Sequence, residues 1–63
     1  MLNARQSRTA SALRAMRPAT MSADTLAMFR NRVYAAIGRA GVHPKYRPQF
    51  EQACGLPAET VTA

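Results

Sequence analysis

The side chains that could perform chemistry in this chain are few. His43 is the only histidine, and histidine is the residue that most readily exchanges protons near neutral pH. Glu51 and Glu59 are not spaced to share one face of a helix, and the sequence contains no glycine-rich phosphate loop or nucleophile motif. Cys54 stands beside Gly55 at an expected helix end, where a cysteine is typically a small buried apolar residue. The sequence therefore predicts a protein that is not an enzyme and in which His43 makes a local hydrogen bond.

A metal or a cofactor is not predicted either. A structural zinc ion takes four ligands, and one histidine with one cysteine cannot supply them. The single cysteine also excludes an internal disulfide. We therefore expect no cofactor, no metal ion and no small-molecule substrate.

Basic residues dominate the first three quarters of the chain. Nine Lys and Arg against three acids give a net charge of +6, and residues 1–47 hold all nine bases with Asp24 as their only acid. Tyr34 and Tyr46 lie among bases, a mixture that can stack on nucleic-acid bases or anchor a protein interface. The neighbouring bases are Arg30, Arg32, Lys45 and Arg47. Such a charge suits an RNA backbone, an anionic lipid surface or an acidic protein face, and equally a solvated face or a targeting signal.

The first twenty residues have the composition of a mitochondrial transit peptide, with four arginines, many Ala, Ser and Thr, and no acid. Leu2, Leu13 and Met16 share one side of a helical wheel, but the arginines scatter around it. Pro18 ends any helix that begins here. We expect residues 1–20 to be an extended or helical basic arm, either a transit-like segment or a tail of the ribosomal or phage kind.

An amphipathic helix is predicted from about Ser22 to Ala40. Ser22 is a suitable N-cap and Asp24 lies in the first turn, where the helix dipole favours an anion. Gly41 can adopt the left-handed conformation that ends a helix, with Val42 placed for the accompanying apolar contact. One face of this helix is apolar and consists of Leu26, Phe29, Val33, Ala36, Ile37 and Ala40.

Prolines divide the remainder of the chain. A rigid connector is expected over residues 42–48, followed by a short helix over about 48–55 that closes at Gly55 with Leu56 packing back, and by a final turn from Pro57 to Val61. Residues 50–61 also resemble part of a helix-turn-helix, although Glu51 replaces the small residue of that motif and no full recognition helix follows. The apolar stretches are all too short for the ~20 residues of a membrane span.

Two mitochondrial families show short resemblances to this chain. The segment Gly41 to Gln52, which reads GVHPKYRPQFEQ, resembles the AGGG-type small accessory subunit of complex I. The pairs Ala40-Gly41 and Lys45-Tyr46 are similar to those of the ATP synthase epsilon subunit, a small helical hairpin. Complex I subunits of that type continue into a transmembrane helix, for which this chain has no counterpart. Both resemblances imply a non-catalytic subunit of an energy-transducing complex.

The sequence predicts a small all-α protein with one main helix, a short C-terminal helical hook, a basic arm over residues 1–20 and a subunit segment over 21–63. Because 63 residues bury little surface, we expect no independent core and an apolar face that is covered by other subunits. The expected function is that of an accessory subunit of a mitochondrial complex, on the matrix side or associated with the inner membrane, or alternatively of a mitoribosomal or other RNA-associated protein. The predicted partner interface is Leu26, Phe29, Val33, Tyr34, Ile37, Tyr46, Phe50 and Leu56, with a basic rim of Arg30, Arg32, Arg39, Lys45 and Arg47.

Overall fold

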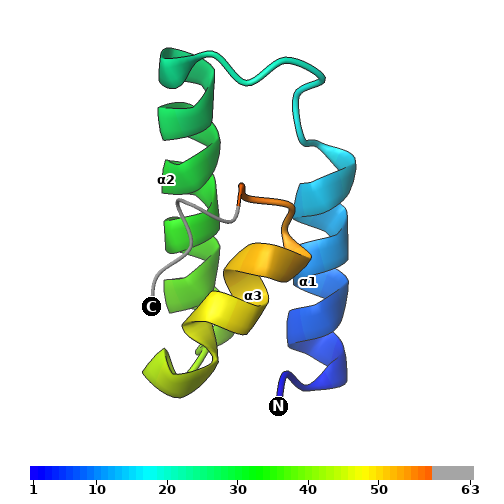
Figure 1. Ribbon diagram of the computed structural model, residues 1–63. Coiled ribbons are helices and arrows are strands. Elements are labelled where there is room, and N and C mark those ends of the chain that lie inside the picture. Colours follow the sequence, from blue (N-terminus) through cyan, green and yellow to red (C-terminus); the bar gives the residue numbers. More distant parts are fainter. Residues whose placement is uncertain (58–63) are drawn as a thin grey trace.

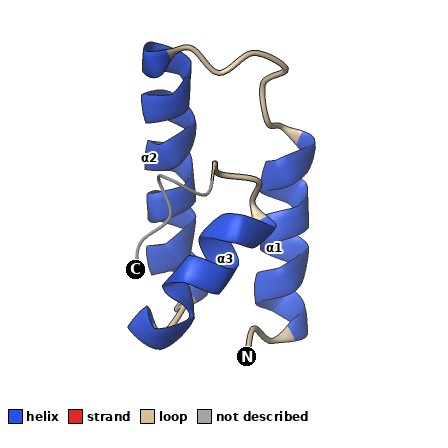
Figure 2. Cartoon of the chain, viewed as in Figure 1, coloured by secondary structure: helices blue, strands red, loops and turns tan. Residues whose placement is uncertain are grey.

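The computed structural model describes residues 1–57, which contain three α-helices and one short 3-10 helix. Helices α1 (Ala4–Ala15) and α2 (Ala23–Ala40) lie side by side and antiparallel, and α3 (Arg47–Ala53) packs across one side of this pair (Figure 1). The 3-10 helix η1 (Pro44–Tyr46) leads directly into α3. Figure 2 shows that the described chain is built from helices and loops alone. The prediction of a small all-α protein is confirmed.

Helix α1 is ordered by a reciprocal cap at its first turn. The backbone N–H of Gln6 donates to Asn3 Oδ1 at 2.8 Å, and the backbone N–H of Asn3 donates to Gln6 Oε1 at 3.1 Å. This capping box satisfies two donors that a helix start otherwise leaves to water. Helix α1 buries the face that carries Gln6, Ala10 and Leu13, and its last turn closes at Met16, ahead of Pro18. The arm predicted from the basic composition is therefore a helix that belongs to the folded body.

Helix α2 begins and ends where its caps predict. The backbone N–H of Thr25 donates to Ser22 Oγ at 3.3 Å, so Ser22 is the N-cap. Gly41 has φ 65° and ψ 37°, which is the left-handed conformation, and the N–H of Val42 donates to the carbonyl oxygen of Ile37 at 3.1 Å. This last bond is the closing bond of a Schellman ending. The prediction for α2 is confirmed to within one residue.

The connector is more helical than predicted, and the short helix that follows it begins one residue early. The segment expected to be a rigid connector contains η1, and α3 begins at Arg47, one residue before the expected start at Pro48. Helix α3 ends as predicted, because Gly55 has φ 88° and the N–H of Leu56 donates to the carbonyl oxygen of Glu51 at 3.2 Å. The predicted turn from Pro57 to Val61 and the acid Glu59 extend beyond the residues that the structure describes.

The chain buries a core of its own. The core draws on all three α-helices and on the residues that follow α2 and α3, and it consists of Ala10, Leu13, Phe29, Val33, Ala36, Ile37, Val42, Phe50, Cys54 and Leu56. The expectation of no independent core is therefore wrong. The physical reason is that α1 packs against both α2 and α3 and contributes the buried side chains of Ala10 and Leu13 to the core. The arginines of α1 are exposed and lie outside this buried face.

Gln6 joins the start of α1 to the end of α2. Its side-chain Nε2 donates to the carbonyl oxygen of Ala40 at 3.1 Å and to that of Gly41 at 3.4 Å. The last carbonyls of a helix have no partner within the helix, so these bonds satisfy groups that would otherwise depend on water. One side chain thus completes the caps at two helix ends that are 34 residues apart in the sequence.

Candidate binding site

The two residues with the most reactive side chains have structural roles. Cys54 is fully buried, and this burial, with the nearby Glu51 as a smaller contribution, raises the pKa of its thiol from 9.0 to about 11. The thiol therefore keeps its proton at neutral pH, as expected for an apolar core residue. His43 accepts a hydrogen bond at Nδ1 from the backbone N–H of Lys45 at 3.0 Å, which caps η1. The predicted local hydrogen bond of His43 is confirmed.

The tyrosines and bases that suggested nucleic-acid stacking form separate pairs. The guanidinium carbon of Arg47 lies 5.6 Å from the ring centre of Tyr34, and Lys45 Nζ lies 5.8 Å from that of Tyr46. The ring of His43 meets the ring of Tyr46 edge to face, with centres 6.1 Å apart. These cation–π and aromatic contacts pair each tyrosine with a side chain of the same molecule. The contact between Arg47 and Tyr34 connects α3 to α2, whereas both contacts of Tyr46 lie within η1 and its N-cap His43.

The predicted partner interface lies largely inside the molecule. Five of its members, Phe29, Val33, Ile37, Phe50 and Leu56, are buried in the chain's own core. Leu26 and Tyr46 are half-buried, and only Tyr34 is exposed. The assignment of the five buried residues to a partner is corrected, because α1 and α3 cover the face that the isolated pattern of α2 left open. Of the predicted basic rim, Arg32, Arg39 and Lys45 are exposed, and Arg30 and Arg47 are half-buried.

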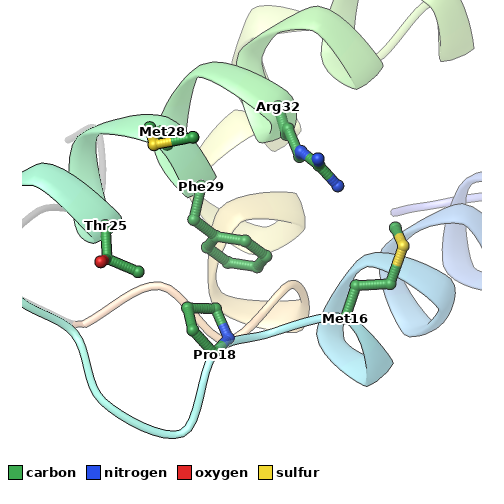
Figure 3. Close-up of a pocket in the computed structure, with 6 residues that line it drawn as sticks. All are labelled: Met16, Pro18, Thr25, Met28, Phe29 and Arg32. Atoms are coloured by element: carbon green, nitrogen blue, oxygen red, sulfur yellow. The ribbon is translucent and has the colours of Figure 1, made fainter.

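An apolar cavity opens between the end of α1, the following loop and the first half of α2. The methionine cavity, as we call it, has a volume of about 200 Å³ and is lined by Met16, Pro18, Thr25, Met28, Phe29 and Arg32 (Figure 3). The rings of Phe29 and Pro18 face each other at its base, and the side chain of Arg32 points toward Met16. Met28 is 68% exposed and Met16 is 55% exposed, so two large apolar side chains stand in solvent at its mouth.

A second cavity lies between α1 and α2 at the opposite end of the pair. The arginine cavity has a volume of about 230 Å³ and is lined by Arg5, Thr9, Ala36, Arg39 and Ala40. The small side chains of Ala36 and Ala40 create the space between the helices. Thr9 Oγ1 donates to the carbonyl oxygen of Arg5 at 2.9 Å, which fixes the hydroxyl against α1. Arg5 and Arg39 are both exposed, so this cavity presents two guanidinium groups to solvent.

The surface around both cavities is strongly basic. Seven of the nine Lys and Arg side chains are exposed, and Asp24 is the only exposed acid among residues 1–57. Glu51, the other acid in that range, is fully buried. An anionic partner would therefore meet an uncompensated positive field over most of the described surface.

Sequence reasoning assigned Arg32 and Arg39 correctly to an exposed basic surface but missed both cavities. Met28 lies outside the apolar face predicted for α2, and Met16 belongs to the apolar side predicted for the first helix. Their proximity depends on the path of the loop over residues 16–22, which no local pattern in the sequence reveals.

These features define the class as a small, basic all-α protein with two surface cavities between its first two helices. Comparisons with protein-family models, curated proteins and solved structures found no match. The resemblances to the complex I subunit and to the ATP synthase subunit therefore stay predictions. Among residues 1–57, no helix combines the length and the apolar character that crossing a bilayer requires.

Proposed function

We propose that this chain is a non-catalytic accessory subunit that binds a larger protein assembly through the surface between α1 and α2. The observation that carries this proposal is the methionine cavity, which keeps Met16 and Met28 in solvent on a body that already buries a core. Exposed apolar side chains that surround a hollow are typical of protein interaction sites. Methionine suits such a site because its flexible thioether adapts to the shape of a partner.

The basic residues support the same assignment. Arg32 lines the apolar cavity, and arginine is enriched at protein interfaces, where it makes hydrogen bonds around an apolar centre. This distribution of an apolar centre with a charged edge favours a protein partner.

The proposed assembly is an energy-transducing complex of the mitochondrial inner membrane. Its support is the acid-free, arginine-rich composition of the first twenty residues, which would act as an uncleaved targeting segment because α1 contributes to the core. The resemblance of the Gly41 to Gln52 segment to a complex I subunit supports the same assembly. The second candidate, an RNA-associated protein of the mitoribosome, is favoured by the seven exposed bases that face a single exposed acid in residues 1–57.

Native purification of the tagged full-length chain from its own cells tests the proposal. The wild type is compared with Met28→Glu and with the matched control Ser11→Glu, which adds the same charge at an exposed position of α1 outside both cavities. We expect the wild type to copurify with inner-membrane subunits at a constant stoichiometry, also after nuclease treatment and in ~0.5 M salt, because salt screens apolar contacts only weakly. Met28→Glu should lose these subunits and Ser11→Glu should keep them. Association that nuclease abolishes would support the RNA candidate. Recovery of the wild-type chain alone would contradict both.

A further inference from the structure

The methionine cavity and the arginine cavity lie along one surface. No residue of α3 lines either cavity, and the residues of α2 that line the two cavities share one face of that helix. On α2 the lining residues Thr25, Arg32, Ala36 and Arg39 follow one another at helical spacing. The opposite wall is formed by Arg5 and Thr9 of α1 and by its C-cap Met16. We call this surface the α1–α2 seam. It begins at an apolar hollow and ends at a pair of arginines.

We propose that the α1–α2 seam binds an amphipathic helix of a partner protein, with an apolar side chain seated in the methionine cavity and carboxylates held by Arg32 and Arg39. This inference rests on the proposed function and specifies the chemistry of the partner. A third helix laid into the seam fits the architecture, since two packed helices present a groove in which a further helix can bury one face.

The charges of the seam select an acidic occupant. Arg5, Arg32 and Arg39 line it, while no acid among residues 1–57 contributes to either cavity. Arginine binds carboxylates in a bidentate geometry, which gives such pairs direction as well as attraction. A second copy of this chain is a poor occupant, because its net charge of +6 would bring one basic surface against another.

The shape of the seam argues against flat or polar partners. A lipid headgroup surface meets a convex apolar face, whereas the apolar residues here surround a hollow of about 200 Å³. The phosphates of a nucleic acid would bind the arginines but would not bury the apolar side chains of Met16, Met28 and Phe29 around that hollow. A helix carries apolar and acidic side chains on one face and so uses both ends of the seam.

The spacing of the seam fixes the pattern of the occupant. Met28 and Arg32 are one turn apart, and Arg39 lies about three turns from Met28, or about 16 Å along the axis of α2. A partner helix that runs nearly parallel to α2 reaches the same three points with a large apolar residue followed by acids about four and eleven positions later. These three positions fall on one face of the partner helix.

A designed peptide tests the inference against the full-length chain. The probe is a fluorescently labelled, side-chain-stapled helix of about 16 residues, with Leu at one position and Glu four and eleven positions later, the rest being Ala, Gln and Ser. Its control has the same composition with the two Glu moved to the opposite face. Anisotropy titrations at 0.15 M salt are expected to give at least tenfold tighter binding for the probe, equivalent to about 1.4 kcal/mol.

Variants of the chain locate the binding. Arg39→Glu and Met28→Glu should each weaken binding of the probe about tenfold, while Arg8→Glu, an exposed charge reversal outside both cavities, should change it less than threefold. A probe with Lys in place of the second Glu should recover binding to Arg39→Glu but not to the wild type, which a loss of folding would not produce. Equal binding of the probe and its control, or equal effects of Arg39→Glu and Arg8→Glu, would overturn the proposal.

Two other probes distinguish the remaining occupants. Vesicles that contain phosphatidylserine and a 16-nucleotide single-stranded RNA are titrated under the same conditions. If the vesicles or the RNA bind more strongly than the peptide, and Arg8→Glu weakens that binding as much as Arg39→Glu does, the occupant is a lipid surface or an RNA and not an acidic helix. If the peptide fails while the chain still copurifies with a complex that Met28→Glu disrupts, the accessory function stands and the acidic helix is wrong.

Discussion

Gln6 provides the sharpest stability test, because one side chain completes the caps of two helices. Its Oε1 accepts from the N–H of Asn3, and its Nε2 donates to the carbonyl oxygens of Ala40 and Gly41. The residue is only 9% exposed, so water cannot replace these bonds without rearrangement. A net contribution of 0.5–1.5 kcal/mol per hydrogen bond gives a loss of about 2 kcal/mol for Gln6→Ala. In a domain of this size that lowers Tm by about 10–15 °C.

The isosteric variant Gln6→Glu separates the two caps. The introduced carboxylate can still accept from the N–H of Asn3 but meets the carbonyl oxygens of Ala40 and Gly41 as a second acceptor, at the negative end of the dipole of α2. Folding therefore raises the pKa of this carboxyl group, because the protonated form can donate a hydrogen bond where the charged form is repelled. The variant should be less stable than wild type at pH 7, and the difference should shrink as the pH falls through the raised folded-state value.

Thermal and urea unfolding of wild type, Gln6→Ala and Gln6→Glu at pH 7 and at pH 4 measure these differences, each variant being compared with wild type at the same pH. The reasoning is refuted if Gln6→Ala is as stable as wild type. It is also refuted if the deficit of Gln6→Glu is the same at both pH values, since the two carbonyl contacts would then not exist in solution.

Three further predictions concern the glycines and the cysteine. Gly38 lies within α2, so Gly38→Ala should stabilise the fold by about 0.5–1 kcal/mol in urea unfolding. Gly41 has φ 65°, which an alanine adopts only with strain, so Gly41→Ala should destabilise the fold by about 1–2 kcal/mol. Neither added methyl group meets an atom within 4 Å, so the backbone conformation alone accounts for the difference. Equal effects of the two substitutions would show that the left-handed ending of α2 is absent. Gly55→Ala should cost more than Gly41→Ala, because its φ is 88° and the new Cβ would lie 3.0 Å from Arg17 Cδ, and the matched Tm values of the two variants decide this. Folding raises the pKa of the Cys54 thiol from 9.0 to about 11, so the stability that the buried thiol contributes is present below pH 9.0 and is lost as the pH rises toward 11. The free energy of unfolding of a Cys54→Ala variant should therefore change less between pH 9 and pH 11 than that of wild type. Identical pH profiles of the two proteins would place the thiol in solvent.

The sequence predicts α2 well because its limits are local. Ser22 and Gly41 act on their own neighbours in the chain, and the apolar spacing between them has only one helical interpretation. The closing of α3 at Gly55 is predictable for the same reason. Such elements need no knowledge of the rest of the fold.

The role of α1 could not be predicted from the same reasoning. Its buried face contains Gln6, a polar residue whose partners Ala40 and Gly41 lie far along the chain. It also contains Ala10, whose small size matters only once other helices are known to pack against α1. The arginines around the helix then dominate the pattern and suggest a detached arm. Burial of a polar residue by a long-range cap is thus the feature that local periodicity misses.

The candidate site was missed because it is assembled from two helices and a loop. Met16 follows α1 whereas Met28 belongs to α2, and Arg5 and Arg39 are brought together only by the antiparallel arrangement of α1 and α2 (Figure 1). The large apolar residues that were expected to bind a partner are instead the ones that build the core. In a chain of this size most large apolar side chains are needed for the core. The surface left for a partner is a short apolar hollow with charged neighbours.

Amide hydrogen exchange of the isolated full-length chain tests most directly whether α1, α2 and α3 form one folded body. We expect the central amides of α1 and α2 to be protected to a similar free energy, which falls by the same amount in both helices when Gln6 is replaced by Ala. If the α1 amides exchange at the rate of an unfolded chain while the α2 amides stay protected, α1 is not part of the folded body. Residues 1–20 would then be a detached basic arm.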